Sequence, residues 1–265
     1  MTQSGRTPPT RKERRAAERA SGKTPTAAQA AKPGWQSPVV LISVGVVIVV
    51  VVIIAIIALM NSQQSSTPIR EAGDVTPADL QDGTSLGDPN APVVIDLYED
   101  PQCPVCGRFN KDLEPLLIST FIKDGTVRLN YKDFVFIGNP GESLDAAVGM
   151  LAAEQLAGKF WAFHDIVYAN QNGENKGGFS RDRLAQMAVK IGLDKDAFLK
   201  LLDDPALIKQ VNDSTDTGKN LGVDSTPTLI VNGQLTPGLP SWDQLSQVIE
   251  QAAAAKASTG ASPAP

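Results

Sequence analysis

Two cysteines, Cys103 and Cys106, are the residues of this sequence whose type and spacing could do chemistry. They are the only cysteines in 265 residues, and they enclose the dipeptide Pro104-Val105. At the start of a helix this spacing allows a disulfide, with Cα atoms roughly 5–6 Å apart. Because a loop this short removes little chain entropy, such a bond would stabilise the fold poorly. The pattern therefore favours a redox-active pair over a structural crosslink.

The position of the pair predicts an acidic thiol. Asp100-Pro101-Gln102 ends an expected strand, and Pro104 suits the first position of a helix. Cys103 would then lie at the positive end of the helix dipole, which lowers a thiol pKa from about 8.5 towards roughly 3.5–7.5. A stabilised thiolate makes the disulfide oxidising. Cys106, one turn further along, is expected to be more buried and to act as the resolving thiol.

The remaining metal-binding residue types are few. A closed structural zinc site needs about four ligands, and the chain offers two cysteines and one histidine. No metal or other cofactor is therefore expected. The single histidine, His164, has the neighbours Phe160, Trp161, Phe163 and Val167, which favours a role in helix packing over a catalytic one.

The order of expected elements places the cysteines in an α/β domain at about 84–251. A strand precedes the cysteines, a helix begins at Cys103, and a second strand follows that helix. The turn Asn232-Gly233 then indicates a hairpin near the end of the domain. This order combines a βαβ unit and a ββα unit, separated by a helical insertion at about 142–222. The expected strands are 93–98, 127–131 and 228–231, and the expected helices after the first are 143–156, 159–170, 180–191, 194–202, 205–221 and 241–253.

An unbroken apolar run from Val39 to Met60 precedes this domain. Its 22 residues would form a helix of about 33 Å, which matches a hydrocarbon core of about 30 Å. A cleaved signal peptide would have an apolar region of only about 7–15 residues and a small-residue cleavage site. The run therefore predicts an uncleaved signal-anchor, with a single transmembrane helix at 38–60.

Charge on either side of this run predicts its orientation. The formal net charge is −5, yet residues 1–37 hold eight Lys or Arg and two Glu. By the positive-inside rule the N-terminus is cytoplasmic and the domain lies outside the cell membrane, where a working disulfide is permitted. A basic head on an acidic body argues against nucleic acid as the main partner. Residues 1–37 are expected to be a disordered tail, 61–83 a linker, and 252–265 a disordered end.

Four stretches, taken in order, resemble the DsbA-like branch of the thioredoxin superfamily in its membrane-anchored Gram-positive or actinobacterial form. They span nearly the whole domain, and although each alone is weak, the set is specific. The stretches are Gly87 to Val94, the Tyr98 to Cys106 block around the cysteines, Lys159 to Asp165, and Ser225 to Gly233. The resemblance implies a thioredoxin-like fold with a helical insertion.

The resemblance also implies functional residues and partners. Pro227 would be cis and would face the cysteines, and the backbone of Thr226 would pair with an extended substrate segment. The protein would act as a monomer that introduces disulfides into exported proteins, recharged by a quinone-linked membrane partner of the DsbB or VKOR type. Pro104 and Val105 would tune the cysteines. Some relatives have His at the position of Val105, so this centre is expected to be less oxidising.

Two further matters stay open at this level. Many thioredoxin relatives place a buried acid six residues before the first cysteine, where this chain has Leu97, so the proton relay for Cys106 is unassigned. The direction of electron flow is also open. A disulfide reductase or isomerase would need a reducing partner and, in many isomerases, a dimerisation domain, which is not visible here. A redox-inert, tethered binding or chaperone module is the alternative of a different class.

Overall fold

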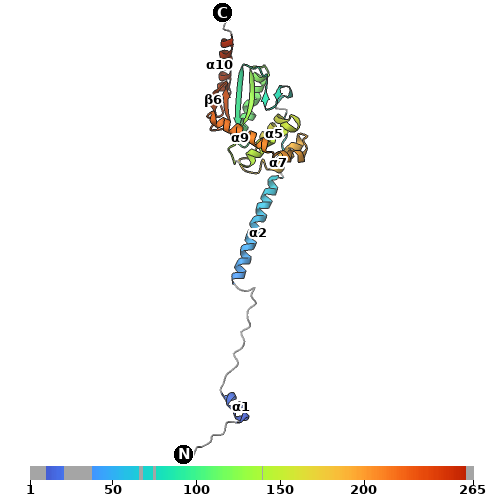
Figure 1. The fold of residues 1–265 in the computed structure, drawn as a ribbon, viewed down its shortest axis with the longest axis vertical. Coiled ribbons are helices and arrows are strands. Elements are labelled where there is room, and N and C mark those ends of the chain that lie inside the picture. Colours follow the sequence, from blue (N-terminus) through green and yellow to red (C-terminus); the bar gives the residue numbers. More distant parts are fainter. Residues whose placement is uncertain (1–9, 21–37, 66–67, 74–75, 139, 261–265) are drawn as a thin grey trace, which may run out of the picture. The chain divides into compact units, whose positions relative to one another are not determined.

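The structure is a computed structural model that describes residues 10–20, 38–65, 68–73, 76–138 and 140–260. The chain divides into two compact units, residues 1–56 and residues 57–265. The second unit carries the sheet and most of the helices (Figure 1).

The first unit contains helix α1 (Arg11–Ala20) and the beginning of helix α2 (Pro38–Ser65). Helix α1 lies inside the segment expected to be disordered. In α2, the side chains described from residue 42 to residue 56 are all exposed. None of the helices in the described residues is long and apolar enough to be identified as crossing a membrane. The transmembrane helix expected at 38–60 thus gains no support from the structure and stays a prediction.

The second unit is built on a six-stranded sheet in the order β1-β2-β4-β3-β5-β6. Strands β3 and β4 are parallel, and the other neighbouring pairs are antiparallel. The three strands and the hairpin expected from the sequence are all present, so the thioredoxin-like α/β fold is confirmed. Their bounds are β3 (Val93–Glu99), β4 (Val127–Asp133), β5 (Thr228–Val231) and β6 (Gln234–Pro237).

Strands β1 (Gln81–Asp82) and β2 (Ser85–Leu86) were not expected from the sequence. They pair with each other, and β2 pairs with β4, so the sheet begins inside the segment expected to be a linker. Each has only two residues, which is too short to show an alternating pattern.

One continuous helical stretch follows the cysteines, and it contains two wide π-type turns. It consists of α3 (Pro104–Arg108), η3 (Phe109–Leu113), α4 (Glu114–Leu117) and η4 (Ile118–Ile122). Such turns are rare and often lie at functional sites. Here they accompany Pro115, which has no backbone N–H to donate inside a helix. The stretch buries Phe109, Leu117 and Ile118 against the core.

The expected helical insertion is confirmed, and its helices pack around α5 (Glu142–Ala157). Gly149 allows this close approach, because a Cβ atom there would lie 2.9 Å from Phe163 and 3.1 Å from Phe198. The last helix, α10 (Trp242–Gly260), packs on β3 and β5 and continues past the expected domain end at 251. The other insertion helices are α6 (Phe160–Ala169), α7 (Arg181–Lys190), α8 (Lys195–Leu201) and α9 (Pro205–Asn220).

Candidate active site

The two cysteines lie at the start of α3, as the sequence predicts. Cys103 is the N-cap residue, and its Sγ accepts a hydrogen bond from the backbone N–H of Cys106 at 3.5 Å. Pro104 occupies the first turn of the helix, where a missing N–H costs nothing. Both thiols are free and buried, Cys103 at 5% exposure and Cys106 at 0%. Val105 between them is half-buried.

A second segment brings Thr226 and Pro227 to the same place. The peptide bond between these residues is cis, as the resemblance implied. The thiol of Cys103 donates to the carbonyl oxygen of Thr226 at 3.4 Å. The segment enters β5, which is antiparallel to β3, and this pairing sets the loop beside the cysteines. The structure therefore brings the start of α3, with Cys103 and Cys106, together with the loop of Thr226 and Pro227.

The environments of the two thiols push their pKa values apart. The pKa of Cys103 falls to about 6, because hydrogen bonds from Cys106, Thr226 and the backbone of Val105 stabilise its thiolate against the effect of burial. The pKa of Cys106 is raised, first by burial, then by its hydrogen bond to Cys103 and by the charge of Glu99. At neutral pH the pair therefore combines an ionised, nucleophilic sulfur at Cys103 with a protonated thiol at Cys106.

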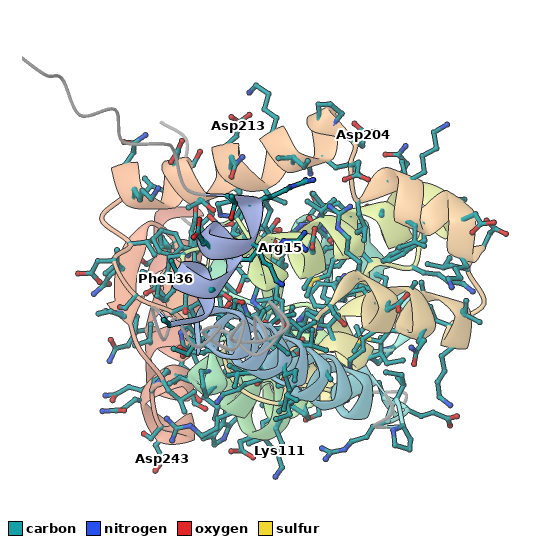
Figure 2. The ribbon with its side chains drawn as sticks, turned by 90° about the horizontal axis from the view of Figure 1, so that it is seen from below. Arg15, Lys111, Phe136, Asp204, Asp213 and Asp243 are labelled. Carbon is teal, nitrogen blue, oxygen red and sulfur yellow. The ribbon has the colours of Figure 1, made fainter. Side chains whose placement is uncertain are left out.

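The carboxylate of Asp100, fully buried, organises the loop before Cys103. It accepts hydrogen bonds from the backbone N–H of Gln102 at 2.9 Å and from the hydroxyl of Ser143 at 2.6 Å. Its second oxygen accepts from the backbone N–H groups of Phe136 and Ile137 at 3.0 Å and 2.9 Å. One side chain thereby joins the active-site loop, the segment after β4 and the start of α5. The side chain of Phe136 itself is half exposed and labelled in Figure 2.

Amide side chains connect the same loop to the helical insertion. Gln171 donates to the carbonyl oxygens of Pro101 at 2.7 Å and Cys103 at 3.1 Å. Gln102, which is buried, accepts from the backbone N–H of Asn175 at 2.6 Å and donates to Ser143 at 2.9 Å. These contacts were not expected from the sequence, because nothing in a single amide residue indicates a partner about seventy positions away.

Behind Cys106 lies a buried acid–histidine cluster, which we define as Glu99, Glu114, His164 and Asp165. Asn110 donates to both oxygens of Glu99 at 3.1 Å. His164 has its Nε2 atom 4.0 Å from Glu99 and its Nδ1 atom 3.0 Å from Asp165. The sequence around His164 predicts a packing residue, and nothing in the sequence pattern pairs it with Glu99. The position of Glu99, next to Asp100 and four residues before Cys103, is the sequence signal that could have identified it as a site residue.

No group of three or more His, Cys, Asp or Glu side chains within the described ranges is arranged to hold a metal ion. The chemistry that the arrangement can support is thiol chemistry: a nucleophilic sulfur, a partner sulfur three residues away, and a backbone carbonyl that can bind an extended segment.

Comparisons with known protein sequences point the same way. A family model described as "Thioredoxin" matches residues 79–251. A protein of Bacillus cereus named "Probable disulfide bond formation protein D" is 31% identical over 170 residues, covering 63% of this chain and 77% of that protein. The residues matched by the family model contain the cysteines, the insertion and the proline loop.

Solved structures share the fold. Oxidised BdbD from Bacillus subtilis superposes with a TM-score of 0.61 at 24% identity, covering 65% of this chain and 93% of that one. The thiol-disulfide exchange protein alpha-DsbA2 from Wolbachia pipientis superposes with a TM-score of 0.54 at 26% identity, covering 63% and 85%.

Proposed function

This chain belongs to the thioredoxin family as a DsbA-like protein-disulfide oxidoreductase, and from that premise we propose that it introduces disulfides into exported proteins through Cys103 and Cys106. One observation carries the proposal. The sulfur of Cys103, with a pKa near 6, lies between the start of α3 and the carbonyl oxygen of Thr226. An acidic thiol is a good leaving group, and its stable thiolate favours the reduced enzyme, which makes the disulfide an oxidant.

The proposed reaction starts from the disulfide form. A substrate thiolate attacks Sγ of Cys103, the bond between the two enzyme sulfurs breaks, and Cys106 leaves as a thiolate that takes up a proton. A second substrate thiolate then attacks the substrate sulfur of the mixed disulfide and releases Cys103 as a thiolate. The substrate loses two electrons and gains a disulfide, and the enzyme pair is reduced.

Substrate binding is assigned to the proline loop. Thr226 would present its carbonyl oxygen to an extended substrate backbone, in the manner of strand addition. Pro104 and Val105 are the residues that would tune the thiols, because they occupy the positions between them. The proposed cycle has two kinds of partner: exported protein thiols as substrates, and a quinone-linked membrane protein of the DsbB or VKOR type as the electron acceptor. We expect the protein to act as a monomer.

Trapping tests the identity of the substrates and the attacking sulfur. The Cys106→Ser variant lacks the resolving thiol, so Cys103 should accumulate as mixed disulfides with exported proteins. Cys103→Ser is the matched control and should trap none. If neither variant forms adducts and the disulfides of exported proteins are unchanged in cells carrying Cys103→Ser, the proposal is wrong.

The direction of electron flow is tested by the reduction potential of the Cys103–Cys106 pair. An oxidase requires a value well above about −270 mV, the value for thioredoxin. A value near that figure would favour the reductase or isomerase function instead.

We propose further that residues 38–60 tether the catalytic domain to the outer side of the cell membrane. The sequence there is a continuous apolar run, and its large side chains from Ile42 to Ile56 are exposed. Exposed apolar surface of this extent marks a site of protein or membrane contact. Deleting 38–60 should move the protein from the membrane fraction to the soluble fraction, and protease added to intact cells should digest the domain of the full chain. Recovery of the full chain in the soluble fraction would contradict the tether.

A further inference from the structure

A short segment before the sheet packs against the helical insertion. We define the strap as residues 68–73, which lie within the segment expected to be a linker. The strap has no helix or strand of its own, yet Ile69 and Ala72 are half-buried and pack against the hydrophobic core. These apolar contacts show that the strap is part of the folded domain and does not simply lead up to it.

Asn170 binds the strap through both groups of its side chain. Its Oδ1 atom accepts from the backbone N–H of Arg70 at 2.8 Å, and its Nδ2 atom donates to the carbonyl oxygen of Arg70 at 2.9 Å. The same nitrogen donates to the carbonyl oxygen of Ile166, in the last turn of α6, at 2.7 Å. Asn170 is only 5% exposed, and a buried amide is costly unless its groups are paired. Releasing the strap would take away partners that this buried side chain needs.

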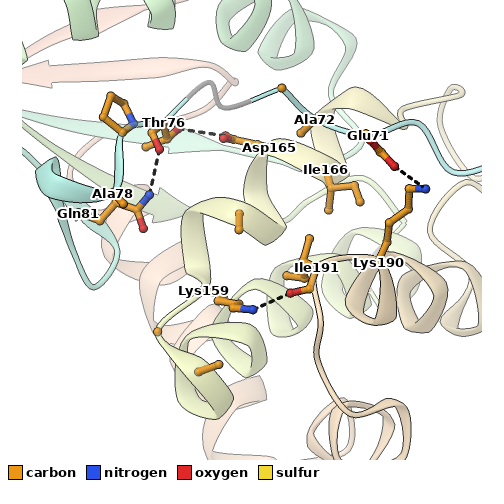
Figure 3. A pocket seen from close by; sticks show the side chains of 15 residues that line it. Glu71, Ala72, Thr76, Ala78, Gln81, Lys159, Asp165, Ile166, Lys190 and Ile191 are labelled. Carbon is orange, nitrogen blue, oxygen red and sulfur yellow. Dashed lines mark hydrogen bonds and ion pairs between the residues drawn. The ribbon is translucent and has the colours of Figure 1, made fainter.

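Two polar contacts continue the docking on either side of a larger cavity. Glu71 forms an ion pair with Lys190 of α7 at 2.9 Å (Figure 3). After the strap, the hydroxyl of Thr76 donates to Asp165 of α6 at 3.2 Å, and all four residues line a cavity of about 860 Å³. The ion pair is largely exposed and contributes little. The buried contact with Asn170 is therefore the one that holds the strap.

Gln171 follows Asn170 directly and reaches the active-site loop. Its amide donates to the carbonyl oxygens of Pro101 at 2.7 Å and Cys103 at 3.1 Å. Gly107 in α3 makes room for this amide, because a Cβ atom there would lie 2.1 Å from Oε1 of Gln171. The residue that binds the strap and the residue that binds the start of α3 are thus consecutive in the chain.

The strap and the start of α3 are also neighbours in space. They line one cavity of about 520 Å³, to which the strap contributes Ala72 and Gly73, and α3 contributes Pro104 and Gly107. Two independent observations, the consecutive amides and the shared cavity, therefore connect the strap to the active-site helix.

We propose that the strap is a positioning element for Cys103: its docking on Asn170 holds Gln171 in place, and Gln171 holds the start of α3 in the arrangement that keeps Cys103 reactive. Asn170 and Gln171 are positioning residues, because they act on the backbone of the loop and not on the sulfur. The inference deepens the proposed function and rests on it, since Cys103 is the sulfur proposed to receive substrate thiols.

The physical reason lies in the bonds that stabilise the thiolate. Cys106, Thr226 and the backbone of Val105 supply the hydrogen bonds that lower the pKa of Cys103. Hydrogen bonds weaken steeply with poor distance or angle, so a helix start that is free to shift stabilises the thiolate less. Releasing the strap should therefore raise the pKa of Cys103, although no group that contacts the sulfur is changed.

Arg70→Pro tests the strap in the reduced full-length chain, because proline lacks the backbone N–H that Asn170 accepts. Arg70→Ala is the matched control, since it removes the same charge and keeps the N–H. The midpoint of Cys103 alkylation against pH should rise in Arg70→Pro by about half a pH unit to one pH unit, the worth of about one hydrogen bond. It should stay at the wild-type value in Arg70→Ala. A wild-type midpoint in Arg70→Pro overturns the proposal.

Release of the strap is measured separately by proteolysis. A glutamate-specific protease can cleave after Glu71, which both variants keep, and mass spectrometry identifies the product. Cleavage there should be about tenfold faster in Arg70→Pro than in Arg70→Ala, because a bond to a buried group is lost. Equal cleavage in the two variants would show that the contact with Asn170 does not hold the strap, and would likewise overturn the proposal.

A double variant tests the route through Gln171. If the strap acts on Cys103 through this amide, Gln171→Ala and the combined Arg70→Pro/Gln171→Ala variant should have the same raised midpoint. Residues that act independently would instead give shifts that add. Additive shifts would therefore overturn the role assigned to Gln171.

Folding is checked by near-ultraviolet circular dichroism of each variant. If Arg70→Pro loses the native spectrum, Ile69→Ser takes its place, because it removes an apolar contact of the strap without altering charge, and the same midpoint and cleavage criteria apply. These measurements report on the thiol alone. A raised midpoint in the strap variants, together with no mixed disulfides in Cys106→Ser, would overturn the proposed function and leave the strap as a positioning element of the thiol.

Discussion

The Sγ atom of Cys103 lies 3.4 Å from the carbonyl oxygen of Thr226, although the two residues are 123 positions apart in the chain. In the reduced protein the thiol donates to this oxygen. When the proton leaves, the carbonyl loses its donor at the moment when the sulfur becomes nucleophilic. The carbonyl oxygen proposed to bind a substrate backbone is therefore the same atom that contacts the sulfur of Cys103, so the proposed binding position lies directly beside the thiol.

The first prediction concerns labelling of the two cysteines. Alkylation of Cys103 in the reduced protein should rise with pH around a midpoint of about 6, because the thiolate is the reacting species. Cys106 should stay unlabelled well above neutral pH, since its pKa is raised. Mass spectrometry of the two labelled sulfurs after brief treatment with iodoacetamide measures both profiles. A midpoint of about 8.5 for both thiols, as in a free cysteine, would contradict the lowered pKa of Cys103 and the raised pKa of Cys106.

The stability of the reduced protein should depend on pH for the same reason. The folded pKa of Cys103 lies below the unfolded value of about 8.5, so its thiolate stabilises the reduced fold fully above that pH. The stabilisation is lost as the pH falls through about 6. Denaturant unfolding of the reduced protein between these limits should therefore show stability rising with pH relative to a Cys103→Ser control. Parallel pH dependences in the two proteins would be inconsistent with this account.

Thr226→Val tests the hydroxyl beside the nucleophile. After the hydrogen bond from Cys106, the Thr226 side chain is among the groups that lower the pKa of Cys103. Removing its hydroxyl should raise that pKa and make the disulfide less oxidising, at about 30 mV for each tenfold change in the exchange constant. In the reduced structure this hydroxyl makes no hydrogen bond, so it can donate to the sulfur once the thiolate forms, and its removal should leave the fold intact. Redox titration against glutathione measures the potential, and an unchanged potential would remove Thr226 from the tuning groups.

Asp100→Ala tests the organisation of the loop. The carboxylate accepts from Gln102, Phe136, Ile137 and Ser143, and its loss leaves buried donors unpaired. We expect a loss of about 3 kcal/mol or more in the free energy of unfolding, since bonds to charged groups are worth about 1.5–3 kcal/mol each. Ser143→Ala disrupts only one of these bonds to the carboxylate and should cost about 1–2 kcal/mol. Equal losses in the two variants would show that Asp100 does not organise the loop.

Val105→His tests the residue between the cysteines. A histidine at this position adds a hydrogen-bond donor, and when protonated a positive charge, close to the start of α3. Both should lower the pKa of Cys103 further and make the disulfide more oxidising. The potential of Val105→His should therefore be higher than that of wild type, with Val105→Leu as the matched apolar control. A potential equal to that of the control would mean that this position does not tune the pair.

The sequence was sufficient for the parts of the fold that depend on local pattern. The strands at 93–98 and 127–131 alternate or carry β-branched residues, and Asn232-Gly233 marks the hairpin, so the structure confirms them. Strands β1 and β2 could not be predicted, because they are strands through their pairing and not through their own sequence pattern: β2 pairs with β4, and β1 pairs with β2.

In the candidate site, too, local motifs could be read from the sequence and contacts between distant segments could not. Cys103, Cys106 and the proline loop were identified because their spacing and motif carry their chemistry. The aromatic sequence neighbours of His164 predict a packing residue, and aromatic rings do surround it. What the sequence could not show is that Glu99, from a strand far from α6 in the chain, lies 4.0 Å from its ring.

The amide of Gln171 bears on attempts to transplant this chemistry. It donates a hydrogen bond to the carbonyl oxygen of Cys103, 68 positions away in the chain. The backbone N–H of Asn175 likewise donates to the side chain of Gln102. Copying Cys-Pro-Val-Cys into another scaffold would therefore transfer the two sulfurs without the hydrogen bonds that orient the loop. A graft that keeps the reactivity of this centre would have to include the loop and the segment around Gln171 and Asn175 together, as one discontinuous part.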